Sequence, residues 1–483
     1  MIDPSRKPRD SRTIMGRMAN GLTAASLIVM CIFVLVNIFS AQSWAEKGAV
    51  AALLVFAVFG QPRFKLRERT LLGLAVLVTL AAFSFKPDAA ALTGAALGKA
   101  AFLASFMILL ALLRDGATTS ESVLNLGRYL SRQPPGRRYL STHLGGHALG
   151  IIFNFGALSL LGPLLQRGIK ATSGDNPTIS AIREQRQISA LNRGFSSFIA
   201  WAPTAVTQAT IPTVIAHVDT LKMAAMGGAV AVALLIVGWG EDRIRWRHTR
   251  ARLLAQGALP EEQENAFPRT DFFRFGGVCA SLAGLALGAI LLSGVKTVPA
   301  MMLAAPLVTV GWIWIQNGRD QLAATGERLR SIAGSSIPDS SPEALTLASA
   351  GYMGLVCAHL VPIETLATVL GLATIAPFIL YALVAAVIPV VSNMGLPPIF
   401  TVTFLGSILN ATPGLDVDPT LLGLSLVLGW TLNLTGSPFS ASSLVLARTT
   451  GIPGRVLSWH WNGAFSVVAY VMIVVLLGIF STL

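Results

Sequence analysis

Long apolar runs, separated by short charged loops, dominate this chain and limit what it can fold into. They recur from Ala19 to the C-terminus of the 483-residue sequence, and only 12% of all residues are charged. Soluble domains carry about 25% charged residues. A run of about 20 apolar residues is long enough to cross a bilayer as a helix. The sequence therefore predicts an all-α polytopic membrane protein embedded in a lipid bilayer, with no large soluble domain.

The basic residues gather in the short loops and at the N-terminus, as the positive-inside rule requires. This placement accounts for the formal net charge of +13, so no nucleic-acid partner is expected. When the basic N-terminus is placed in the cytoplasm, the chain makes about eleven transmembrane crossings. A bacterial-type inner membrane is the predicted location, with the protein spanning it many times.

Two stretches of the chain have the same arrangement of interrupted apolar segments. Each is an apolar segment broken at an asparagine, Asn154 in residues 139–166 and Asn393 in residues 374–411. Each is followed by a second long apolar segment that proline interrupts, residues 188–216 and residues 419–446. Paired interruptions in the two halves of a membrane protein point to the substrate site of a transporter. The duplication therefore predicts a carrier.

The charges around the two broken segments set their predicted orientation. Basic residues flank residues 139–166 on both sides, which favours a re-entrant hairpin that enters from the cytoplasm. The flanks of residues 374–411 are nearly uncharged, which favours a hairpin that enters from the outside. The two repeats are thus predicted to be inverted, and the two hairpins are expected to meet near mid-membrane around one site.

The predicted organisation has five parts. Residues 1–95 form N-terminal scaffold helices, residues 96–239 form the first repeat, and residues 240–274 form a basic cytoplasmic linker. Residues 275–343 form further scaffold helices and an amphipathic connector, and residues 344–483 form the second, inverted repeat with the last helix. The three cysteines lack metal-ligand spacing, so neither a zinc site nor a disulfide framework is expected.

Polar residues at the interruptions are the candidate substrate and ion ligands. A helix that ends inside a membrane exposes backbone groups with a partial charge, and nearby hydroxyl or amide groups can complete a binding site. The alternative is that these side chains only satisfy the broken helices. The candidates are Asn154, Ser392, Asn393, Thr435, Gly436, Ser437, Pro438 and Ser440, with Pro203, Thr204, Thr207 and Gln208 at the first interruption.

Arg193 is a further candidate, because it lies a few residues inside a predicted span. A charged residue within a membrane segment is by default a functional hypothesis. Its guanidinium could bind a carboxylate or phosphate through two hydrogen bonds. The alternative is that the long side chain snorkels to the cytoplasmic surface.

The order of elements and two short motifs resemble a known family. Ser392-Asn393 stands where an S-N-T hairpin tip is expected, and residues 436–441 (GSPFSA) align with a G-T-P-P-N-A loop. In the first repeat only Asn154 of the tip is kept. This pattern resembles the ion-transporter superfamily, especially its divalent anion/sodium symporter branch of dicarboxylate and citrate carriers. The resemblance implies that the tips bind substrate carboxylates and coupling sodium ions, and it implies a homodimer and an elevator-type motion.

The predicted function is secondary active transport of a small, carboxylate-like organic anion, coupled to sodium or protons. No GxxxxGK[ST] phosphate loop is present, so ATP drive within the chain is unsupported. No cofactor is expected apart from a coupling sodium ion. Because Phe153 and Phe155 replace the hydroxyl residues of the first tip, a symmetric dicarboxylate is less expected.

Two other functions remain open at this point. One is a cation/proton or inorganic-anion carrier of the same superfamily, although the interrupted segments contain no Asp or Glu, which proton antiport usually needs. The other is a membrane-embedded transferase that acts on lipid-linked substrates, with His143 and His147 as its site. The carrier is favoured over the enzyme because an enzyme needs no inverted duplication.

Overall fold

The computed structural model describes residues 11–131, 133–134, 136–172, 177–255, 266–317 and 321–482. All regular elements among these residues are helices. Seven of the described helices, or eight if one bent pair forms a single span, are long and apolar enough to cross a membrane. The prediction of an all-α polytopic membrane protein is confirmed. The sequence-based estimate of about eleven crossings is higher because several apolar segments are divided into shorter helices.

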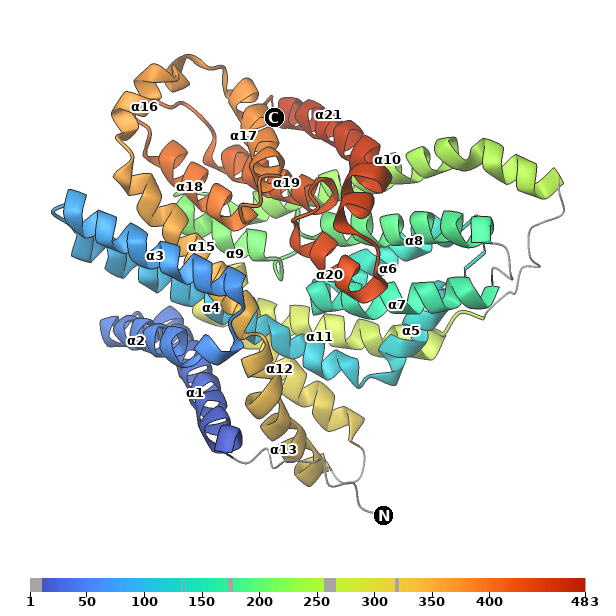
Figure 1. Ribbon diagram of the computed structural model, residues 1–483, viewed down its shortest axis with the longest axis horizontal. Coiled ribbons are helices and arrows are strands. Elements are labelled where there is room, and N and C mark those ends of the chain that lie inside the picture. The colour runs from blue at the N-terminus through green and yellow to red at the C-terminus, as the bar shows by residue number, and fades with distance from the viewer. Residues whose placement is uncertain are drawn as a thin grey trace.

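The helices outside the two repeated series, called the outer helices here, come from the N-terminus and from the middle of the chain. They are α1 (Ser11–Ser40), α2 (Ser43–Phe59), η1 (Gln61–Arg63), α3 (Leu66–Phe85), α11 (Arg269–Ser293), α12 (Thr297–Gln316) and α13 (Gln321–Ser331). α1, α2, α12 and α13 lie in the lower part of Figure 1. α1 packs on α2, and α11 packs on α12. Large apolar side chains such as Leu80, Phe83 and Leu291 are exposed on these helices. Lipid chains can cover such side chains, which agrees with a membrane position.

The remaining helices form two series with the same order of elements. The first series is α4 (Ala89–Thr118), α5 (Glu121–Ser131), α6 (Arg138–Phe153), α7 (Phe155–Thr172), α8 (Pro177–Phe198), α9 (Val206–Val214) and α10 (Thr220–Ala255). The second is α15 (Ser341–Leu360), α16 (Ile363–Val369), η4 (Leu372–Thr374), α17 (Pro377–Ser392), α18 (Pro398–Ala411), α19 (Pro419–Gly436), α20 (Ala441–Thr450), η5 (Val456–Trp461) and α21 (Asn462–Phe480).

The two series have corresponding contacts. Within each series the first hairpin helix packs on the interrupted helix, α6 on α8 and α17 on α19. The second hairpin helix packs on both series, α7 on α8 and α20, and α18 on α15 and α9. The long helices α4 and α15 pack on each other and connect these series to the outer helices. This correspondence agrees with two repeats, whereas their opposite orientation in a membrane stays a prediction.

The helix backbones come into direct contact around the first interruption. A Cβ atom added to Gly194 of α8 would lie 2.0 Å from the carbonyl oxygen of His143 in α6. A Cβ atom added to Gly227 of α10 would lie 2.0 Å from the carbonyl oxygen of Ala200. Only glycine permits so close an approach. These contacts fix α6 and α10 against the end of α8.

The segments predicted as linker and connector are largely helical. α10 continues to Ala255, since the Arg, Glu and Leu residues that fill this stretch are good helix formers. Residues 256–265 of the predicted linker lie outside the described residues, as do the basic residues 1–10. The predicted connector contains α13, η3 (Ile332–Ser336) and α14 (Ile337–Asp339).

Candidate functional site

The hairpin tip between α17 and α18 lies on the break between α19 and α20. The Asn393 Nδ2 donates a hydrogen bond to the Gly436 carbonyl oxygen at 3.3 Å, and the Ser437 Oγ donates to the Ser392 carbonyl oxygen at 3.2 Å. The indole nitrogen of Trp459 donates to the Asn393 Oδ1 at 3.1 Å. The structure therefore brings four predicted site residues together, and it adds Trp459, which sequence reasoning missed.

The carbonyl oxygen of Leu434, in the last turn of α19, joins the two interrupted helices. It accepts hydrogen bonds from the Ser442 Oγ at 2.7 Å and the Ser440 Oγ at 3.2 Å. It also accepts from the Nδ2 of Asn192 in α8 at 3.3 Å. The Ser440 Oγ in addition accepts from the Ser443 backbone N–H at 3.2 Å, as an N-cap of α20 does. The hydroxyls at this break thus satisfy freed backbone groups, and the Asn192 amide ties the two series together.

The remaining predicted residues of the second break lie beside this cluster. The Thr435 Oγ1 donates to the Leu432 carbonyl oxygen at 3.2 Å and lies 3.0 Å from the Ser466 Oγ of α21. Pro438 lies in the short non-helical segment between α19 and α20, where its carbonyl oxygen approaches the backbone of Gly454 closely. Both residues help to shape the break.

The first interruption is closed by its own side chains. The Thr207 Oγ1 donates to the Ile199 carbonyl oxygen at 2.5 Å, and the Gln208 Nε2 donates to the Ala200 carbonyl oxygen at 3.1 Å. Pro203 lies within the irregular segment between α8 and α9. Thr207 and Gln208 therefore satisfy the carbonyls that the break leaves free, as polar side chains do in kinked membrane helices.

Several buried polar atoms near the two breaks lack a hydrogen-bond partner within the described protein. They are the Ser392 Oγ, the Thr204 Oγ1, the Asn192 Oδ1 and both amide atoms of Asn433. Buried polar groups are nearly always hydrogen-bonded, so such atoms fit a place where water, an ion or a solute completes the set. Sequence reasoning passed over Asn192 and Asn433, although an amide within an apolar helix is the signal that would have found them.

Arg193 does not face an open site. Its guanidinium donates to the Asn462 Oδ1 and to the Glu241 Oε2, both at 2.7 Å, and it stacks on the Phe465 ring at 4.2 Å. The side chain is 3% exposed, so it does not snorkel to a surface either. Arg193 instead joins α8 to α10 and α21. The guanidinium is thus held by partners within the protein.

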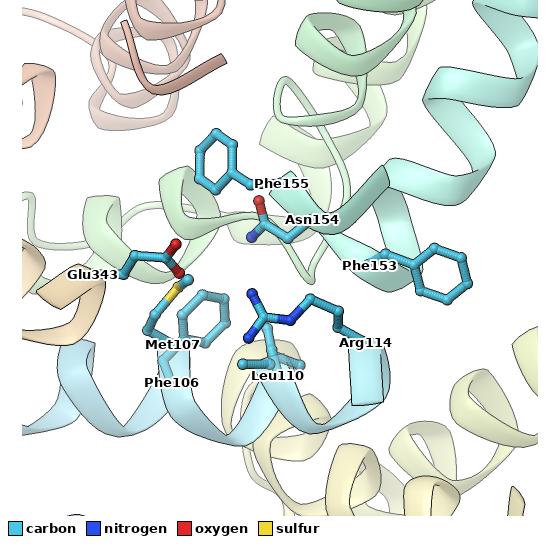
Figure 2. A pocket seen from close by; sticks show the side chains of 9 residues that line it. Phe106, Met107, Leu110, Arg114, Phe153, Asn154, Phe155 and Glu343 are labelled. Carbon is cyan, nitrogen blue, oxygen red and sulfur yellow. The ribbon is translucent and has the colours of Figure 1, made fainter. Parts of the chain in front are cut away.

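Asn154 lies apart from the Asn393 cluster and lines a different, small cleft. It adopts φ of +49° with ψ of −132°, outside the left-handed helical region, and this bend separates α6 from α7. Figure 2 shows the side chains of Arg114 and Glu343 directed toward the same cleft as the Asn154 amide. The structure thus divides the predicted site residues between two places.

Glu343 corrects one step of the sequence argument. The interrupted segments themselves contain no carboxylate, but the first turn of α15 places the Glu343 side chain in the cleft at the first hairpin tip. Arg114, near the end of α4, reaches the cleft from another side. Neither residue stands in a predicted motif. Only the packing of α4 and α15 against the tip brings them to it.

Comparison with known proteins gives a fold and no sequence family. No protein-family model matches the chain, and no curated protein matches it in sequence. The YdaH transporter of Alcanivorax borkumensis, described as having an unusual topology, is similar in structure, with a TM-score of 0.52 and 14% identity over 86% of this chain and 98% of that one. MtrF of Neisseria gonorrhoeae, described within a class of antimetabolite efflux pumps, has a TM-score of 0.51 and 13% identity over 86% of this chain and 94% of that one. The chain therefore has the fold of these multi-pass membrane transporters, while neither comparison names the divalent anion/sodium symporter branch.

Proposed function

We propose that the chain is a secondary active transporter of a small organic anion, coupled to sodium or protons. The contact between the two interrupted helices, from Asn192 in α8 to Leu434 in α19, carries this proposal. It places two helix breaks next to each other, each beside a hairpin, in a fold shared with two transporters. Discontinuous helices that meet in this way form the substrate sites of many carriers.

Unpartnered amide groups favour an anionic or polar solute. The Asn433 Nδ2 can donate hydrogen bonds to an oxygen atom of the solute, and the Asn192 and Asn433 Oδ1 atoms can accept from a solute or coordinate a sodium ion. Export of an antimetabolite, the activity of the class described for MtrF, is one direction that such a carrier could take. The resemblance to divalent anion/sodium symporters, a homodimer, an elevator-type motion and an inner-membrane location with a cytoplasmic N-terminus belong to the same proposal.

Counterflow of labelled organic anions in proteoliposomes tests this function. Benzoate, succinate and citrate serve as probes, each with and without a sodium or a proton gradient. We expect one of them to exchange across the membrane, and we expect Asn433→Leu to lower the exchange rate at least tenfold. Asn433 bonds to no described protein group through its side chain, so the substitution removes no internal hydrogen bond.

Thr431→Val is the matched control, because Thr431 is also buried on α19 but bonds within its own helix, to the Val427 carbonyl oxygen. The control should exchange anions at nearly the wild-type rate. If the wild-type protein exchanges none of the probes, or if Asn433→Leu behaves like the control, the proposal is wrong.

Of the two histidines of the rival transferase, His147 is already bonded within the protein, whereas the buried His143 Nδ1 has no partner among the described residues. The His147 Nε2 accepts a hydrogen bond from the Trp201 indole at 3.2 Å, which requires the neutral ring to carry its proton on Nδ1. That Nδ1 lies 2.9 Å from the Ser197 Oγ. Both ring nitrogens of His147 are thus used between α6 and α8, which disfavours a catalytic base at this position.

A further inference from the structure

The cleft at the first hairpin tip has the groups of a charged binding site that the two helix breaks do not use. Asn154 contributes an amide, Arg114 a guanidinium and Glu343 a carboxylate, each from a different element (Figure 2). Apolar side chains, among them Phe106 and Met107, surround them. A guanidinium in such surroundings interacts with an anion more strongly than it does in water.

Arg114 is positioned for a ligand and only partly used by the protein. One of its terminal nitrogens donates to the Ser340 Oγ at 3.1 Å. Its aliphatic part lies against Gly156, where an added Cβ would come within 2.8 Å of the Arg114 Cδ. Glycine at this position therefore lets the guanidinium lie under the hairpin tip. Neither the Asn154 amide nor the Glu343 carboxylate makes a side-chain hydrogen bond or ion pair among those that the structure shows for the described residues.

The charged groups that face Glu343 are cations. Arg114 of α4 and Arg448 of α20 both act on its carboxylate. α18, which also packs on α15, contains no charged residue. Asp339 of α14 is paired with Arg63 at 2.7 Å. The ionised Glu343 carboxylate therefore weakens the electrostatic attraction of the Arg114 guanidinium for an incoming anion.

We propose that Arg114 and Asn154 bind the anionic group of the transported solute, and that Glu343 carries the coupling proton. This inference rests on the proposed function. When the Glu343 carboxylate takes up one proton, Arg114 loses one of its two neighbouring negative charges, the other being Asp115, and can bind the carboxylate of the solute. When the solute leaves, Glu343 releases that proton on the same side. One proton therefore moves with each bound carboxylate group, in the same direction.

The physical reason for the coupling is charge balance in the cleft. A guanidinium flanked by a bound anion and an ionised carboxylate would leave one negative charge in excess. The repulsion between the two negative charges disfavours keeping both ionised, although solvent at the exposed Glu343 weakens it. Anion binding and protonation of Glu343 consequently favour each other. For a solute with one carboxylate, the loaded carrier has the same net charge as the empty one.

Two transport modes of the same proteoliposomes test this assignment. Glu343→Gln keeps the shape and the neutral, protonated-like state of the side chain. It should preserve counterflow of the probe anion within about threefold, make counterflow independent of pH, and abolish accumulation driven by a proton gradient. Arg114→Gln should reduce both modes at least tenfold, by raising the KM for the anion. Glu364→Gln on α16 and Arg67→Gln on α3 are exposed controls that should leave both modes unchanged.

Each outcome separates this inference from the proposed function. If wild-type protein moves no probe anion, the proposed function fails. If wild-type protein moves an anion but Glu343→Gln still accumulates it with a proton gradient, Glu343 does not carry the coupling proton. The same assignment would be overturned if anion accumulation by the wild-type protein requires a sodium gradient and does not depend on the proton gradient. An unchanged KM in folded Arg114→Gln would remove Arg114 from the anion site.

Discussion

Replacing Arg193 by glutamine should destabilise the protein by about 3 kcal/mol without changing its affinity for a transported anion. The Asn462 Oδ1, which belongs to a fully buried side chain, would lose its partner at 2.7 Å. Leaving such an acceptor unpaired costs about 1–3 kcal/mol. Glu241 would keep Arg245 at 3.4 Å, so the loss on that side is smaller, about 1 kcal/mol.

A double-mutant cycle measures the Arg193–Glu241 interaction itself. Glu241→Gln should also destabilise, because it leaves the buried Arg193 guanidinium without its anion. The double variant should be more stable than the sum of the two single losses predicts, by about 1–3 kcal/mol. Chemical unfolding in detergent gives the free energies of unfolding, and proteoliposome uptake gives the KM.

Arg67→Gln is the control for charge alone, because Arg67 is exposed on α3. The reasoning is refuted if Arg193→Gln unfolds like the wild-type protein while its KM for the anion rises tenfold. That result would show that the guanidinium is released from Asn462 during transport and binds the solute, as the sequence alone suggested.

Gly194→Ala should prevent α6 and α8 from packing, because the new Cβ would lie 2.0 Å from the His143 carbonyl oxygen; size-exclusion chromatography should show loss of folded protein. Gly73→Ala on α3, where the new Cβ meets open space, should instead raise the free energy of unfolding by up to about 1 kcal/mol, and equal effects of the two substitutions would contradict this argument. Trp201→Phe should lower the free energy of unfolding by about 1 kcal/mol, because the His147 Nε2 loses its donor; thermal unfolding like that of the wild-type protein would count against the bond.

The two interrupted segments were predictable because their signals are local. Proline and glycine within apolar runs mark breaks in any surroundings. The second hairpin, predicted at residues 374–411, consists of α17 and α18 from Pro377 to Ala411. Asn393 and Ser437 were also predicted to share a site. The structure brings them together through bonds from the Asn393 side chain to the Gly436 carbonyl oxygen and from the Ser437 side chain to the Ser392 carbonyl oxygen. The motif resemblance was stronger in this repeat, and the short sequence motifs were sufficient to predict which residues come together there.

Partners far apart in the chain could not be predicted in the same way. Arg193 was a candidate for an anion site because an intramembrane arginine is by default a functional hypothesis, and snorkelling to the surface was the alternative. Its partners Glu241 and Asn462 lie 48 and 269 residues further along the chain. The cleft at Asn154 likewise combines Arg114 and Glu343, which come from the two long helices α4 and α15. No periodicity or motif in the sequence relates these positions.

The sequence by itself determined that this protein is helical, embedded in a membrane and interrupted twice, because hydropathy and helix-breaking residues act over a few neighbouring positions. Only the tertiary structure decided which polar groups remain open. It pairs the Arg193 guanidinium inside the protein and leaves the amides of Asn433 without a partner. It also separates Asn154 from the Asn393 cluster. Whether a polar side chain is satisfied depends on helices packed from distant parts of the chain, and a buried polar group is either paired or left for a ligand.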